Sequence, residues 1–89
     1  MEKQMTDTEK LVKLQIRSLQ NSTMIEMLNI YRDFKKGVLN EEEARDMTTN
    51  FYDLLRQAML EVGEEMPNAI KLKYKLFMHE YGKNVFVGL

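Results

Sequence analysis

The side chains best suited to catalysis are scarce and scattered in this chain. His79 is the only histidine, Ser18 and Ser22 are the only serines, and the 89 residues include no cysteine. A serine, histidine and carboxylate triad would have to join a serine near the N-terminus to a histidine near the C-terminus. The lack of cysteine excludes a thiol nucleophile, a thiolate zinc site and a disulfide.

The densest group of potential metal ligands is acidic and consists of Glu41, Glu42, Glu43 and Asp46. On a helix only Glu42 or Glu43 shares a face with Asp46, and the spacing is not that of a calcium-binding loop. Acidic residues at a helix start favour the positive end of the helix dipole, which explains the group without a metal. The four glycines are isolated, so they form no phosphate-binding loop. We therefore expect a protein that is not an enzyme and has no cofactor.

The segment from Lys35 to Ala44 combines a helix end with a helix start. Gly37 follows two lysines and stands where a left-handed residue commonly ends a helix. Asn40 is a good N-cap, and Glu43, three residues later, completes a capping box. The pattern predicts two long helices joined by a tight turn.

Apolar residues at helical spacing predict an all-α fold in one domain that spans residues 1–89. Caps and breakers divide it into a small bundle of three to four helices, at about 7–20, 23–36, 41–62 and 68–81. The division between the first two rests on the cap-type residues Asn21-Ser22-Thr23.

The C-terminal segment has two readings. Between Ile70 and Leu76 apolar residues alternate with lysines, which is typical of a strand and would give three helices plus a C-terminal β-hairpin. Ile70 is, however, the only β-branched residue from 69 to 81, and Pro67 and Gly82 suit a helix start and end. These features favour a helix, followed by strand-like residues at 85–87.

The apolar faces of the expected helices differ in number. The helices at 23–36 and 41–62 each have one apolar stripe, formed by Met24, Met27, Leu28, Tyr31 and Phe34 and by Ala44, Met47, Phe51, Leu54, Leu55, Ala58, Met59 and Val62. Ile25 and Leu60 fall off these stripes. The helices at 7–20 and 68–81 are apolar on two sides, and such a helix must be enclosed or bury its second side against another chain. We therefore predict that a partner contacts Leu11, Leu14, Leu60, Leu72 and Leu76.

Charge is unevenly distributed, although the formal net charge is only −1. Residues 37–68 carry two basic and eight acidic side chains, whereas residues 69–89 carry four basic and one acidic. The N-terminus lacks the apolar core of a signal peptide, and no stretch approaches the roughly 20 apolar residues of a membrane span. We expect a cytoplasmic protein that does not bind membranes.

These observations predict a small interaction module or regulator of bacterial or phage type. It would bind another protein or complex through a helical face, inhibit it by doing so, and self-associate through the same kind of surface. The alternative is a helix-turn-helix-like DNA-binding regulator that uses the basic C-terminal segment. The four acids at the start of its recognition helix would repel phosphates, so nucleic acid is the less favoured partner.

Overall fold

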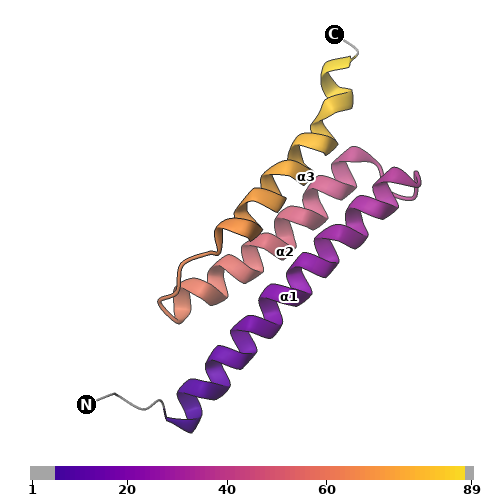
Figure 1. The fold of residues 1–89 in the computed structure, drawn as a ribbon. Helices are drawn as coiled ribbons and strands as arrows, with labels where there is room; N and C mark the ends of the chain where they lie inside the picture. The colour runs from indigo at the N-terminus through magenta and orange to yellow at the C-terminus, as the bar shows by residue number, and fades with distance from the viewer. Residues whose placement is uncertain (1–5, 88–89) are drawn as a thin grey trace.

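Three helices form the whole of the described structure. The computed structural model describes the backbone of residues 6–87 and the side chains of residues 6–82. The helices are α1 (Asp7–Lys35), α2 (Glu41–Glu61) and α3 (Asn68–Val87), and they run up, down and up side by side (Figure 1). No strand occurs between residues 6 and 87, so the all-α bundle is confirmed and the C-terminal hairpin is not supported.

Helix α1 is continuous where the sequence predicted a break. Its 29 residues run without interruption through Asn21, Ser22 and Thr23. Thr23 is buried in the core, whereas Asn21 and Ser22 face solvent. Polar residues at such exposed positions cost about 0.5 kcal/mol each in helix propensity, which the packing of the residues on either side can offset. The bundle therefore has three helices, and residues 7–20 and 23–36 belong to the same one.

The turn between α1 and α2 has the predicted caps. Gly37 adopts φ +80°, and its amide donates to the Phe34 carbonyl while that of Val38 donates to Asp33, at 3.1 and 2.9 Å. These two bonds form a Schellman motif. The Asn40 side chain accepts from the Glu43 amide at 2.8 Å, and the Glu43 carboxylate accepts from the Asn40 amide at 3.0 Å. The turn therefore leaves few backbone groups unpaired.

Helix α3 begins directly after Pro67 and continues past Gly82. The Pro67 carbonyl accepts hydrogen bonds from the amides of Ile70 and Lys71, both at 3.1 Å. The backbone of residues 85–87 is helical, so the predicted strand character of this tail is wrong. The helix places Ile70, Phe77 and Tyr81 in the core, a spacing of seven and four residues that only a helix turns to one side.

The core lies between the three helices and is narrow. Its buried apolar members are Met27, Ile30, Ala44, Leu55, Met59, Ile70, Phe77 and Tyr81. Aromatic rings connect the helices: Tyr31 lies 5.1 Å from Phe77, and Tyr52 stacks on Tyr74 at 4.0 Å. Four residues predicted to lie in apolar core stripes are exposed instead: Leu28, Met47, Leu54 and Val62. Each helix of the described structure packs against only two others. These two cover a narrower part of its circumference than its apolar residues occupy, so the apolar residues at the edges of the stripe stay exposed.

Candidate protein-interaction surface

The five leucines predicted to contact a partner are all exposed. Their side chains retain between 50% and 68% of their accessible surface. Leu11 and Leu14 lie on α1, Leu60 lies near the end of α2, and Leu72 and Leu76 lie on α3. The accessibility that partner contacts require is therefore present at each position, but the residues are divided among three helices.

On α1 the exposed apolar residues form two pairs. Leu11 and Leu14 are separated by three residues, and Ile25 and Leu28 repeat this spacing two heptads further along. All four project away from the side of α1 that holds Met27 in the core. The sequence correctly placed Ile25 outside the core stripe, but it wrongly placed Leu28 within that stripe.

On α3 Leu72 and Leu76 are one turn apart and share an exposed face. Lys73 and Lys75 are exposed beside them, so the apolar pair has a basic margin. Because Tyr31 packs on Phe77 at 5.1 Å, Leu76 lies at the level of the C-terminal half of α1. This α3 face, defined by Leu72 and Leu76, is separate from the exposed pair Leu11 and Leu14 near the start of α1.

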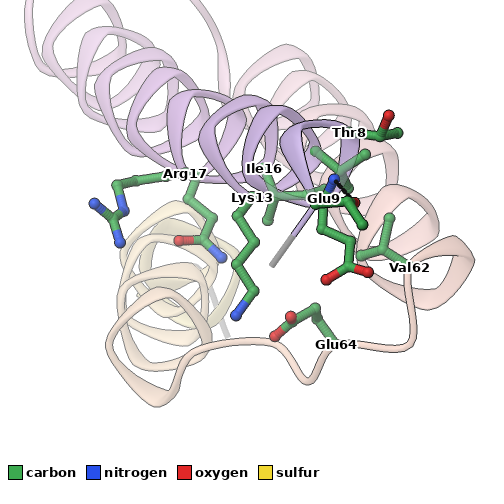
Figure 2. A pocket seen from close by; sticks show the side chains of 10 residues that line it. Thr8, Glu9, Lys13, Ile16, Arg17, Val62 and Glu64 are labelled. Carbon is green, nitrogen blue, oxygen red and sulfur yellow. Dashed lines mark hydrogen bonds between the residues drawn. The ribbon is translucent and has the colours of Figure 1, made fainter. Parts of the chain in front are cut away.

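A hollow lies between the first half of α1 and the loop that follows α2. It encloses about 730 Å³, and Val12 and Ile16 contribute apolar surface to it. The side chains of Glu9, Lys13 and Glu64 extend into it (Figure 2). The hollow exists because the core-facing side of α1 continues beyond the end of α2. Glu9, Lys13 and Glu64 thus place charges of both signs beside these apolar side chains.

The acidic residues at the start of α2 stabilise the N-terminal end of the helix. Glu43 is occupied by the capping box, and Glu41 and Glu42 lie in the first turn, where they favour the helix dipole. Across residues 6–82, no group of three metal-ligating side chains is close enough to hold an ion. Exposed His79 stands apart from the hollow, on α3.

The arrangement differs from that of DNA-binding helix pairs. In a helix-turn-helix the two helices cross at roughly 90–120°, whereas α1 and α2 lie side by side and antiparallel (Figure 1). Lys71 and Lys75 share one side of α3, but Lys73 lies on another, so the lysines do not form one basic stripe.

None of the helices in the described part of the chain is long and apolar enough to cross a membrane. Comparison of the chain with models of protein families, with curated proteins and with solved structures gives no match.

Proposed function

We propose that the protein is a non-enzymatic interaction module that binds another protein and inhibits or biases it by occupying a surface. The observation that carries this proposal is the distribution of apolar side chains. Among the described residues, the exposed large apolar side chains outnumber the buried apolar ones. A monomeric soluble protein rarely leaves apolar surface exposed in contiguous patches unless another molecule covers them.

The α3 face is the surface that we assign to this partner. Leu72 and Leu76 supply a compact apolar centre, and Lys73 and Lys75 supply a polar margin. Interfaces commonly have this organisation, with a desolvated centre and a charged rim. The partner should therefore present an apolar groove with acidic residues at its edge. Leu60, exposed near the end of α2, is a further candidate contact residue.

Affinity capture from a nuclease-treated bacterial lysate tests the proposal. The double variant Leu72→Asp and Leu76→Asp should lose a stoichiometric protein partner that the parent chain retains. Leu54→Asp is the matched control, because Leu54 is 62% exposed on α2 and Leu72 is 59% exposed on α3. Circular dichroism should show equal helix content in all three proteins. Absence of any partner, or recovery that depends on nucleic acid, would contradict the proposal.

A further inference from the structure

The side of α1 that faces away from the core carries a regular row of exposed side chains. This outer row consists of Asp7, Leu11, Leu14, Ser18, Asn21, Ile25, Leu28 and Arg32. Its members are separated alternately by four and three residues, which averages 3.5. That repeat keeps one seam of a helix directed at a neighbouring helix in a left-handed coiled coil. The row therefore has the spacing of a helix-pairing surface, although neither α2 nor α3 covers it in the described part of the chain.

The outer row has the same order of apolar and polar residues from either end. Apolar pairs lie on each side of a polar centre formed by Ser18 and Asn21. If a second α1 is laid antiparallel on the first, Leu11 of one chain faces Leu28 of the other. Leu14 likewise faces Ile25, and Ser18 faces Asn21. A two-fold axis between residues 19 and 20 then makes every contact occur twice, as in an isologous dimer.

The charges at the two ends of the row select the antiparallel direction. Asp7 of one copy would face Arg32 of the other, and both ends of the contact would gain this pair. A parallel arrangement would place Asp7 against Asp7 and Arg32 against Arg32, which repel. Within the described part of the chain, neither Asp7 nor Arg32 has an ion-pair partner. Both charges are therefore available to a second copy.

The exposed area agrees with such a contact. The chain presents 6882 Å² to solvent, against about 5,500 Å² for a folded monomer of its mass. The surplus exceeds the roughly 800 Å² per partner that a standard interface buries. The elongated shape is the cause, since the radius of gyration is 16.3 Å where about 12 Å is usual for this length.

We infer that the protein forms a homodimer in which α1 pairs with α1 of a second copy, antiparallel, through the outer row. Leu11 and Leu14 are then buried between the two copies, and the α3 face stays free on each of them. This inference is independent of the proposed function, because the dimer forms in purified protein without any other partner.

Cysteine cross-linking of the purified protein tests the register, because the natural chain contains no cysteine. Leu11→Cys chains mixed with Leu28→Cys chains should form a disulfide-linked dimer under mild oxidation. Each variant alone should not, because positions 11 and 11 of the two copies would lie about 26 Å apart along the helices. Cross-linking of each variant with itself would indicate a parallel pair and overturn the inference, as would a monomer by light scattering.

Variants that add or reverse a charge in the outer row provide a second, quantitative test, in which analytical ultracentrifugation measures the dimer dissociation constant. Leu14→Asp should raise the dimer dissociation constant at least about a hundredfold, because two apolar contacts become buried charges. Leu54→Asp is the control on α2, because Leu54 is as exposed as Leu14, and it should leave the dissociation constant unchanged. Arg32→Asp should weaken the dimer roughly three- to tenfold, and adding Asp7→Arg should restore it. If these charges act only on the dipole of their own helix, the double variant will be less stable than Arg32→Asp, without rescue of dimerisation.

Discussion

The Thr48 hydroxyl donates a hydrogen bond to the phenol oxygen of Tyr81 across 3.3 Å. Both side chains are fully buried, so this bond joins α2 to α3 inside the core. From α1, Phe34 packs edge-on against the Tyr81 ring at 5.0 Å, and Tyr31 lies 6.3 Å from it. Tyr81 is thus in contact with all three elements of the bundle, and its position depends on their correct assembly.

Tyr81→Phe should lower the free energy of unfolding by about 1–2 kcal/mol, because the buried Thr48 hydroxyl loses its partner. The loss stays in this range because a helical threonine can donate instead to the carbonyl four residues earlier. Tyr74→Phe is the matched control. Its hydroxyl bonds to Thr49 at 3.2 Å in a half-buried position, where water can replace it, so its effect should be smaller. Urea denaturation of both variants measures the difference, and equal losses would contradict the assignment.

The sequence predicted the ends of the helices better than their faces. Gly37, Asn40 and Glu43 could be assigned because capping involves residues within one turn of each other, so neighbouring residue types determine it. The burial of Leu54 was predicted wrongly because helical periodicity shows that residues share a side, but not how wide a sector the other helices cover. Asn21-Ser22-Thr23 are also cap-forming residues, and they wrongly predicted a helix break. The helix continues there because Thr23 packs in the core.

That misleading cluster also concealed part of the candidate site. The exposure of Leu11 and Leu14 was predicted, but they were placed on a different helix from Ile25 and Leu28. Only a continuous α1 aligns the two pairs in one outer row. The hollow near Ile16 was also missed. It forms because α1 is longer than α2, and this length could not be predicted while α1 was divided into two helices.

Two glycines should respond to alanine in opposite directions. Gly37 has φ +80°, a conformation in which a Cβ atom costs about 1–2 kcal/mol, although nothing lies within 4 Å of it. Gly37→Ala should therefore destabilise the protein through the backbone alone. Gly82 lies inside α3 with equally open surroundings, so Gly82→Ala should stabilise by about 0.5–1 kcal/mol. Thermal unfolding of the two variants should show melting temperatures that shift to opposite sides of the parent.

Proline at position 22 tests the continuity of α1. Ser22→Pro removes the amide that bonds to the Ser18 carbonyl and places its ring against that carbonyl, which costs about 3 kcal/mol or more inside a helix. Ser22→Ala is the control and should be neutral or slightly stabilising, because Ser22 is exposed. Chemical denaturation monitored by circular dichroism compares them. A small effect of proline would mean that the chain bends at the cap-type residues after all.

Tyr81, which is buried, and Tyr52, which is half-buried, should make the protein sensitive to alkali. Burial raises the pKa of Tyr81 above its usual 10, and nearby Tyr31 adds to this, while the Thr48 hydrogen bond opposes it. Burial likewise raises the pKa of Tyr52, with a further contribution from Tyr74. The folded chain therefore holds these protons more tightly than the unfolded chain does.

This difference fixes the sign of the pH dependence. Below about pH 10 both states keep the phenol protons and tyrosine contributes no slope, whereas above it the unfolded chain releases them first. The Tyr81 contribution to stability then falls by up to about 1.4 kcal/mol per pH unit until its folded pKa is reached. Urea midpoints measured between about pH 9 and 11 should decline less steeply in Tyr81→Phe than in the parent. Lysines also titrate in this range, but they are common to both proteins and do not affect the comparison. Equally steep declines in the two proteins would show that folding does not raise the pKa of Tyr81.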